Sequence, residues 1–218
     1  MARDAIVYVV DDDIDFLESL RSFLEAAEFR VKIFASAQQL MDTVELAPNS
    51  CIVADVRMPG IDGLTLQGRL KERHLNIPIV FISGYGDVDL AVRAMRQGAV
   101  DFIEKPVNPA MLIESVNRAL QASRSLWERV NAEARARALV STLSAREREV
   151  FNLLAEGLQN ADISSKLHIS IRTVEVHRAN LYRKLEVKNL AALVRLALLA
   201  GIVSATDLFE PPARASAD

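Results

Sequence analysis

Acidic side chains, a hydroxyl and a lysine stand at the ends of apolar, strand-like segments in the first half of this 218-residue chain. They are Asp11 and Asp12 after the run 6–10, Asp55 at the end of 51–55, Ser83 at the end of 77–83, and Lys105 after 100–104. The carboxyl ends of parallel strands meet at one edge of a sheet, where ligands bind in open α/β folds. Clustered carboxylates at such an edge suit Mg²⁺, which takes one or two carboxylates and keeps several waters. A lysine and a hydroxyl that face the same point suit a phosphoryl group.

This set of residues predicts an aspartyl phosphate that forms with Mg²⁺, with Asp55 as the nucleophile. Simpler interpretations exist for each residue alone, because Asp55 could begin a turn and Lys105 could be a solvated surface lysine. A Mg²⁺-dependent aspartyl-phosphate phosphatase is an alternative, but it needs a second acid two residues after the nucleophile, where this chain has Arg57. A dinucleotide-binding site would need a glycine-rich turn after the first strand, where this chain has three aspartates.

Strand and helix patterns alternate over about the first 120 residues. Apolar β-rich runs are followed by segments whose apolar residues recur three and four apart, which is typical of helices with one buried face. This alternation predicts a five-stranded parallel sheet of the flavodoxin-like kind, with helices on both faces. We expect strands at 6–10, 31–34, 51–55, 77–83 and 100–104, and helices at 14–27, 36–44, 64–73, 88–97 and from 110 onward.

The second half of the chain is predicted to be helical. Residues 110 to about 140 are good helix formers without a strong breaker, so we expect the helix that begins near 110 to run on as a linker. Four short helices should follow, with Ser144, Asn160, Ser170 and Asn189 as their caps. The second and third of them, 161–167 and 171–185, are joined by a three-residue turn, which is helix-turn-helix spacing.

We therefore expect an α/β domain at 4–122, a helical linker at 123–140, an all-α domain at 141–203 and a disordered tail at 204–218. The charge differs between the halves: residues 1–120 carry 12 basic and 18 acidic residues, a balance of −6, whereas 141–203 carry 9 and 6, a balance of +3. Such asymmetry indicates two domains with different partners.

The composition also indicates the cellular compartment in which the protein acts. A single cysteine excludes a disulfide framework and fits a reducing cytosol. No apolar run reaches the roughly 18 residues that span a bilayer, and the start lacks the apolar core of a signal peptide. We expect a cytoplasmic protein without a membrane partner.

The predicted helix 171–185 has two different faces. The apolar residues expected to point inward are Ile171, Val174, Leu181 and Leu185. The opposite face carries Arg172, Val176, Ala179, Asn180 and Arg183, with Glu175 at its edge. A positive face with small side chains suits a DNA major groove, although a solvated face in an adaptor module without DNA binding stays open. Arg178 lies nearer the inward edge, and we expect it to pair with Glu147 or Glu149.

Residues 4–122 resemble the CheY-like receiver domain of bacterial two-component response regulators. The matching segments are Val9-Val-Asp-Asp-Asp13, Asp55-Val-Arg-Met-Pro-Gly-Ile-Asp-Gly63, Ile82-Ser-Gly-Tyr85 and Gly98-Ala-Val-Asp-Phe-Ile-Glu-Lys-Pro106. The resemblance implies that a sensor histidine kinase phosphorylates Asp55. It implies that Asp12, Asp55 and the backbone carbonyl of Arg57 hold Mg²⁺, with Asp11 acting through water.

The same resemblance implies that Ser83 and Lys105 move toward the phosphoryl group, that Phe102 is an aromatic switch, and that the Lys105–Pro106 bond is cis. This chain has Ser83 where many members have threonine, and Phe102 where some have tyrosine. Both residues keep the chemistry that these positions need.

Residues 139–203 resemble the LuxR-type helix-turn-helix. The matching segments are Leu143-Ser-Ala-Arg-Glu-Arg-Glu-Val150, Leu153-Leu-Ala-Glu-Gly157, Asn160-Ala-Asp-Ile163 and Ile169-Ser-Ile-Arg-Thr-Val-Glu-Val-His-Arg178. Together the two parts resemble the FixJ/NarL subfamily of transcriptional regulators, and the run 101–106 favours its FixJ branch. This implies a signalling protein and not an enzyme, which dimerises when phosphorylated, binds double-stranded promoter DNA and acts on RNA polymerase.

The resemblance also implies which side chains touch DNA. Glu175, Val176 and Ala179 would face bases. The residues that would mostly touch phosphates or sugars are Arg172, Thr173, Asn180, Arg183 and Lys184.

Overall fold

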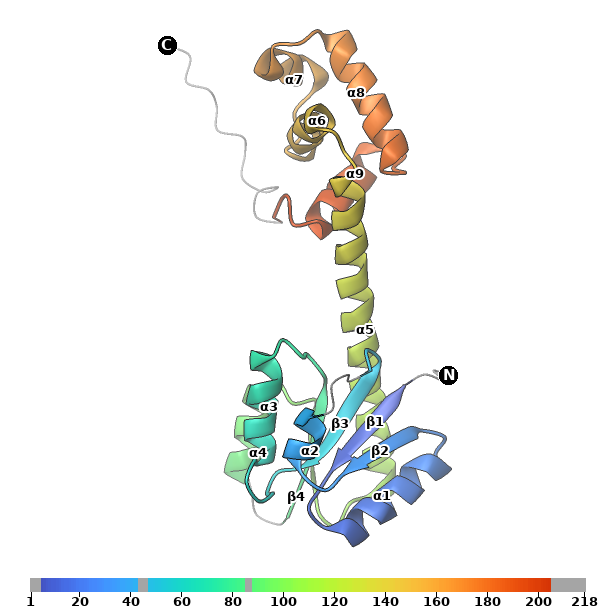
Figure 1. Cartoon of the computed structure of the whole chain (residues 1–218), viewed down its shortest axis with the longest axis vertical. Helices are drawn as coiled ribbons and strands as arrows, with labels where there is room; N and C mark the ends of the chain where they lie inside the picture. Colours follow the sequence, from blue (N-terminus) through green and yellow to red (C-terminus); the bar gives the residue numbers. More distant parts are fainter. Residues whose placement is uncertain (1–4, 43–46, 85–87, 205–218) are drawn as a thin grey trace. The chain divides into compact units, whose positions relative to one another are not determined.

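The structure is a computed structural model that describes residues 5–42, 47–84 and 88–204. It divides the chain into two units, residues 1–128 and 129–218, which we treat separately (Figure 1). The predicted disordered tail at 204–218 lies outside the described residues except for Ser204.

The first unit is built on a parallel sheet of five strands, as predicted from the alternating pattern. They are β1 (Ile6–Val10), β2 (Arg30–Phe34), β3 (Ser50–Asp55), β4 (Ile79–Ser83) and β5 (Asp101–Glu104), in the order β2-β1-β3-β4-β5. Val10 is paired with Ala54, so the residues that follow them, Asp11 and Asp55, leave the sheet at the same edge. Ser83 is paired with Glu104, which brings the end of β4 beside Lys105.

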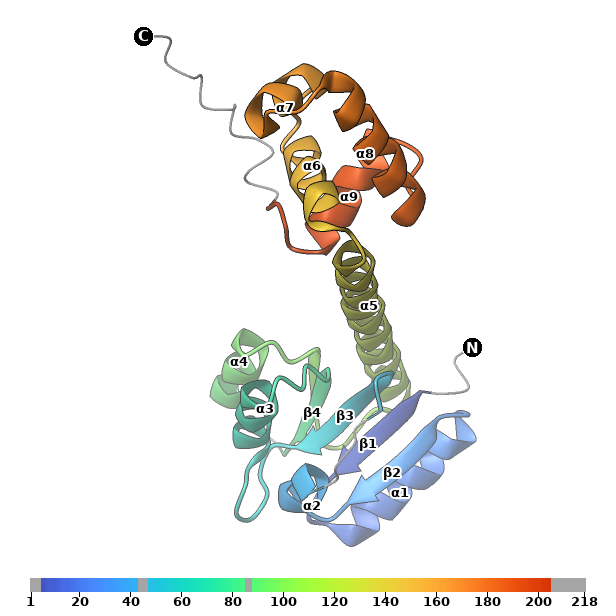
Figure 2. The same cartoon turned by 45° about the horizontal axis from the view of Figure 1, so that its top comes forward.

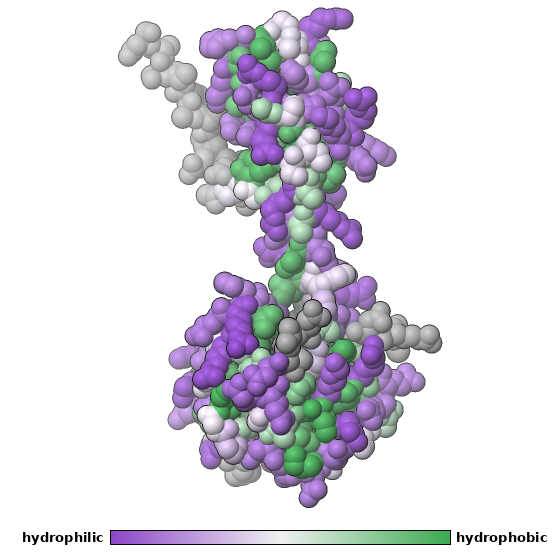
Figure 3. All heavy atoms as spheres, viewed as in Figure 1, coloured by the Kyte–Doolittle hydropathy of each residue, from purple (hydrophilic) through white to green (hydrophobic). Residues whose placement is uncertain are grey.

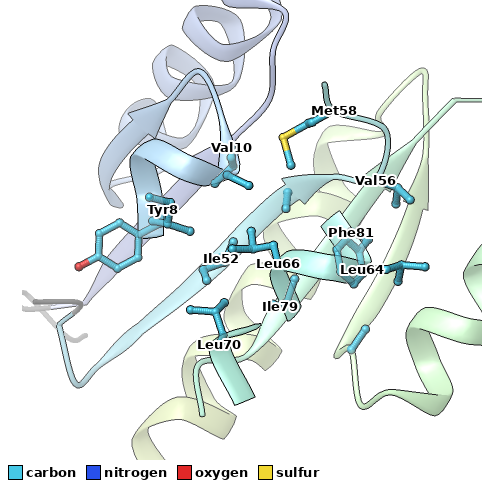
Figure 4. Close-up of a cluster of buried hydrophobic side chains, with 14 of the residues drawn as sticks. Tyr8, Val10, Ile52, Val56, Met58, Leu64, Leu66, Leu70, Ile79 and Phe81 are labelled. Atoms are coloured by element: carbon cyan, nitrogen blue, oxygen red, sulfur yellow. The ribbon is translucent and has the colours of Figure 1, made fainter. Parts of the chain in front are cut away.

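Helices cover both faces of this sheet, which confirms the predicted fold class (Figures 1 and 2). They are α1 (Ile14–Ala26), α2 (Ala37–Asp42), α3 (Gly63–Glu72), α4 (Val88–Arg96) and α5 (Pro109–Ser141). On one face α1 and the first part of α5 bury leucines, valines and alanines against the sheet. On the other face α2, α3 and α4 form a second cluster, in which Leu66 and Leu70 of α3 lie near Ile52 and Ile79 of the sheet (Figure 4).

The edge strands β2 and β5 both carry charged side chains. Arg30 and Lys32 of β2 are exposed, as is Glu104 of β5. Asp101 of β5 accepts a hydrogen bond from the Ser115 hydroxyl and pairs with Arg118, whose Nη2 lies 2.5 Å from Oδ2. Two residues of α5 therefore hold the start of the last strand.

The second unit consists of the end of α5 followed by α6 (Ala145–Ala155), α7 (Asn160–Leu167), α8 (Ile171–Lys184) and α9 (Leu190–Leu199). Their buried residues form one core that includes Phe151, Val174, Leu181 and Leu193. Ser144, Ser170 and Asn189 cap their helices as predicted, since each side chain accepts a backbone N–H of the first turn.

The prediction that Asn160 caps α7 is wrong. Gln159 is the N-cap residue of α7, and Asn160 is the first residue of the helix. The Gln159 N–H donates to Asp162 Oδ2 at 3.3 Å, while the Asn160 side chain accepts a hydrogen bond from Arg178. The side chain that was expected to cap α7 therefore contacts another helix of the same unit.

Hydrophilic side chains cover most of the face of either unit that is drawn in Figure 3. Among the described residues, no helix combines the length and the apolar character that crossing a membrane requires.

Gly63 lets α3 begin directly beside the end of β3. Its N–H donates to the Val56 carbonyl at 3.0 Å, and a Cβ added there would lie 2.6 Å from the Asp55 carbonyl oxygen and 2.8 Å from the Phe81 ring. Any larger residue would have to displace the backbone that carries Asp55. Gly68, five residues later in the same helix, has nothing within 4 Å of an added Cβ.

These two glycines should respond oppositely to alanine. We expect Gly63→Ala to lower the free energy of unfolding of the first unit by about 1–3 kcal/mol, because overpacking shifts the backbone. Gly68→Ala should raise it by about 0.5–1 kcal/mol, because alanine loses less conformational freedom in a helix. Urea unfolding followed by circular dichroism measures both changes. Equal effects of the two substitutions would contradict the close approach at Gly63.

Candidate functional site

One lysine lies between two buried carboxylates at the carboxyl edge of the sheet. Lys105 Nζ is 2.9 Å from Asp11 Oδ2 and 2.9 Å from Asp55 Oδ1. Asp11 is 2% exposed and Asp55 is 7% exposed, so neither charge is well solvated. The ammonium also lies 4.2 Å from the centre of the Phe16 ring, which favours a cation there. The site is thus a cation held between two acids that would otherwise repel each other.

The strand order explains how these side chains meet. Asp11 and Asp55 follow or end the neighbouring strands β1 and β3, while Lys105 follows β5 and reaches across the end of β4. The Lys105 N–H donates to the Ser83 carbonyl at 2.7 Å, and the following Lys105–Pro106 peptide is cis, as the resemblance implied.

Both carboxylates are also held by backbone groups. Asp55 Oδ2 accepts the Arg57 N–H at 2.6 Å, and Asp11 Oδ1 accepts the Asp13 N–H at 2.9 Å. Each acid therefore uses one oxygen for the backbone and the other for Lys105. This leaves both carboxylates in fixed orientations.

The electrostatics of the site follow from burial and from this pairing. Burial raises the pKa of the Asp55 carboxyl above its ordinary value, although hydrogen bonding to Lys105 acts in the opposite direction. Burial by itself lowers the pKa of Lys105, but its hydrogen bonds to Asp55 and Asp11 outweigh this effect, so the pKa is raised. Lys105 consequently keeps its charge at neutral pH.

The remaining predicted residues of this site lie around the same edge. Ser83 is fully buried at the end of β4. Phe102 of β5 is half-buried against the core formed by α2, α3 and α4. Asp12 is exposed, and together with Arg57 it lines a depression of about 490 Å³ beside the paired acids.

These oxygen donors fit Mg²⁺. Asp12 and Asp55 offer carboxylates and Arg57 offers a carbonyl, and Mg²⁺ needs no more than one or two carboxylates because it retains waters. In the part of the chain that the structure describes, no three His, Cys, Asp or Glu side chains gather in a metal-binding arrangement.

Sequence reasoning missed Phe16 and Arg93 as members of this region. Phe16 lies in the first turn of α1, and its ring meets the Lys105 ammonium. Arg93 of α4 lines the depression beside Asp12. No spacing rule places either residue there, because both come from helices whose angle to the sheet is set by packing.

A second set of functional candidates lies on α8. Arg172, Glu175, Val176, Ala179 and Arg183 are exposed, while Thr173 and Asn180 are half-buried. Val176 is 54% exposed although it is apolar. Val174, Leu181 and Leu185 are buried as predicted. Ile171 was expected to point inward, but it is 49% exposed because it is the first residue of the helix and lies beyond the packed core.

Two cations of α8 are engaged within the second unit. Arg178 Nη1 donates to Asn160 Oδ1 of α7 at 3.0 Å, and its guanidinium lies 5.3 Å from the centre of the Tyr182 ring. Lys184 Nζ lies 2.6 Å from Glu147 Oε2 of α6. The expected pairing of Arg178 with Glu147 or Glu149 is therefore wrong, since Lys184 takes Glu147 and Arg146 takes Glu149 at 2.7 Å.

Glu147 has two roles at the start of α6. Its Oε2 accepts the Ser144 N–H at 2.8 Å in a capping box and also accepts Lys184. The side chain is buried, with 5% of the residue exposed. Hydrogen bonding to Lys184, and then to the Ser144 backbone, lowers the pKa of Glu147 to about 2.

Both parts of the chain match known protein families. Residues 7–117 match the model of the response regulator receiver domain, and residues 141–197 match that of the luxR family of bacterial regulatory proteins. The chain is 43% identical over 208 residues to the transcriptional regulatory protein FixJ of Bradyrhizobium diazoefficiens, which covers 94% of this chain and 100% of FixJ.

This chain is a response regulator of the FixJ/NarL subfamily. Two solved structures agree with that assignment. The response regulator StyR superposes with a TM-score of 0.78 at 38% identity, over 89% of this chain and 98% of StyR. Full-length FixJ from B. japonicum superposes with a TM-score of 0.55 at 40% identity, over 91% of this chain and 98% of FixJ. The response regulator thus combines a receiver domain with a LuxR-type DNA-binding domain, and its curated relatives are regulators of transcription.

The Glu147–Lys184 pair should make the second unit sensitive to acid. The folded pKa lies below the ordinary value of 4.5, so the contribution of this pair is complete above about pH 4.5 and is lost as the pH falls through 2. We expect the native protein to be more stable than Glu147→Gln above about pH 5, and the difference in the melting temperature of this unit to shrink steadily as the pH falls from 4.5 to 2. Calorimetric melting of both proteins between pH 7 and pH 2 measures it. A difference that stays constant over this range would contradict the lowered pKa.

Proposed function

We propose that this response regulator accepts a phosphoryl group on Asp55 from a sensor histidine kinase and then regulates transcription by binding promoter DNA through α8. The observation that carries the proposal is the Lys105 ammonium, placed 2.9 Å from Asp55 and 2.9 Å from Asp11 at the carboxyl edge of the sheet. An acid at this edge that is oriented by a backbone N–H and faced by a fixed cation suits the acceptance of a phosphoryl group.

The transfer is a substitution at phosphorus. A carboxylate oxygen of Asp55 attacks the phosphorus of a phosphohistidine, the P–N bond breaks, and the imidazole nitrogen leaves with the electron pair. Asp12, Asp55 and the Arg57 carbonyl would hold Mg²⁺, with Asp11 acting through water. The bound metal ion supplies positive charge against the phosphoryl oxygens.

After the transfer, the new phosphoryl oxygens are acceptors for the Lys105 ammonium and the Ser83 hydroxyl. Lys105 then exchanges part of its contact with Asp55 for a phosphoryl oxygen, and Ser83 shifts toward the same group. Phe102, half-buried on the adjacent strand, turns inward into the space that opens near Ser83. The phosphorylated chain is itself the signal, so no product leaves it and the protein is not an enzyme.

Phosphorylation would shift the receiver toward a state that dimerises through α4 and β5. Val92 and Met95 of α4 are exposed although they are apolar, and Arg96 follows them on the same helix. Such a shift requires that the phosphoryl group interact more favourably with one receiver state than with the other. The dimer would present two copies of α8 to paired half-sites in double-stranded DNA.

On DNA, the exposed side of α8 would enter the major groove. Glu175, Val176 and Ala179 would face bases, while Arg172, Thr173, Asn180 and Arg183 would contact phosphates or sugars. Lys184 was expected among the phosphate contacts, although its ammonium is paired with Glu147. The protein would act in the cytoplasm, where it would meet both its kinase and RNA polymerase.

Asp55→Asn should abolish phosphorylation. We expect acetyl phosphate or a phosphorylated histidine kinase, with Mg²⁺, to add one phosphoryl group to the native protein and none to the variant, because asparagine offers no carboxylate nucleophile. Intact-mass measurement detects the added group. Asp15→Asn is the matched control, since Asp15 is an exposed acid in the first turn of α1. Undiminished labelling of Asp55→Asn would exclude this acceptor.

Sedimentation of the same samples tests the dimer. The labelled native protein should sediment as a dimer, whereas the unlabelled protein and Asp55→Asn should stay monomeric. A labelled monomer that binds promoter DNA tightly would refute a switch based on dimerisation.

Two substitutions on α8 should separate base reading from phosphate contact. Val176→Ala should change which DNA sequence is preferred, because an apolar side chain at that place can contact a thymine methyl. Arg183→Ala should weaken binding to all sequences about equally and reduce the salt dependence by about one unit of slope. Selection of bound sequences and titration against salt measure these effects. If neither change alters DNA binding, the adaptor module without DNA binding becomes the better interpretation.

A further inference from the structure

The cations of α8 fall into two groups. Arg172 and Arg183 are exposed, and Arg183 makes only a 3.3 Å contact to Asn180 of its own helix. Arg178 is half-buried and Lys184 has a side chain that is 39% exposed, but both contact residues of other helices in the second unit. The four residues carry the same charge, but the two groups differ in the contacts that they make within the second unit.

Lys184 joins the end of α8 to the start of α6. It is the last residue of α8, and its partner Glu147 lies in the first turn of α6. Glu147 is buried and already accepts the Ser144 N–H, so its carboxylate cannot follow Lys184 outward without losing its cap. A DNA phosphate would have to compete with a partner at 2.6 Å whose loss leaves a buried charge unpaired.

Arg178 joins the middle of α8 to the start of α7. Its guanidinium donates to Asn160 Oδ1 and lies against the Tyr182 ring, which sits one turn further along α8. Asn160 is the first residue of α7, so this contact links the two helices that flank the turn. The two cations are six residues apart and hold α8 to two different helices.

We propose that Lys184 and Arg178 are positioning residues, which fix α8 against α6 and α7 in the orientation that binds DNA and do not themselves contact phosphates. This rests on the proposed function of α8 as the DNA-reading helix. Lys184, which was expected to contact a phosphate, would therefore affect DNA binding only through the position of α8.

The dependence of DNA affinity on salt distinguishes the two roles. A phosphate contact releases a counterion, so its loss lowers the slope of log affinity against log salt by about 0.9. Loss of a positioning residue weakens binding at every salt concentration but leaves the number of phosphate contacts and the slope unchanged. Glu147 provides the decisive comparison, because a buried residue of α6 has no surface to offer to DNA.

The experiment uses the full-length phosphorylated protein and its selected DNA, with affinity measured per folded molecule from 50 to 200 mM salt. The variants are Lys184→Met, Glu147→Gln, their double variant, Lys184→Arg and Arg178→Met. Arg183→Ala is the benchmark for a phosphate contact, and Lys166→Met controls for loss of one positive charge, because Lys166 is exposed and lies 3.8 Å from its acid.

We expect Lys184→Met and Arg178→Met to weaken binding roughly three- to thirtyfold with an unchanged slope, in the range that coupling between contacting residues produces. Glu147→Gln should also weaken it, the double variant should be no worse than the weaker-binding single variant, and Lys184→Arg should restore most of the affinity. Lys166→Met should bind nearly as the native protein does.

Three outcomes would overturn the proposal. A slope that falls for Lys184→Met as it does for Arg183→Ala, with no effect of Glu147→Gln, would make Lys184 a phosphate contact. Native affinity per folded molecule in Lys184→Met and Arg178→Met, with only a lower melting temperature, would leave these residues a purely structural role. Failure of the native phosphorylated protein to bind any DNA would instead remove the proposed function, and this inference with it.

Discussion

The first unit depends on one ammonium group between two buried carboxylates. Asp11 and Asp55 leave adjacent strands at the same edge, and without Lys105 their charges would repel in a region with little water. The strand order β2-β1-β3-β4-β5 is what lets a lysine from the edge of the sheet reach the acids at its centre. Gly63 serves the same arrangement from the other side, because only a residue without a Cβ allows α3 to begin against the Asp55 carbonyl.

The second unit repeats this principle with different elements. Glu147 is buried at a helix start, where it caps its own helix and pairs with Lys184 from another helix. In both units a buried acid accepts a backbone N–H and a lysine at once, so its position is set from two directions. The difference lies in exposure: the acids of the first unit lie beside an open depression lined by Asp12 and Arg57, whereas Glu147 is enclosed by helices.

The sequence predicted the site at the sheet edge better than it predicted the helical unit. The carboxyl ends of parallel strands all lie at the same edge of a sheet. The pattern of apolar runs alone therefore predicted that Asp11, Asp55 and Lys105 lie close together. The contacts of helix residues are harder to predict. Side chains at the border between the two faces can point to the core or to solvent, and long side chains can reach several partners. Arg178, Lys184 and Ile171 are such border or end residues, and their partners or exposure became clear only from the packing of α6 and α7. The cap of α7 was misplaced by one residue, since the helix begins at Asn160, whose side chain accepts a hydrogen bond from Arg178.

The charges on the two edge strands have a consequence for how the protein behaves in a crowded solution. An open sheet leaves unpaired N–H and C=O groups along its outer strands, and such strands can add to those of another molecule and start aggregation. In β2 the exposed Arg30 and Lys32 oppose this, and in β5 the pair Asp101–Arg118 and the exposed Glu104 do so. Edge-to-edge joining of sheets is therefore costly for this chain.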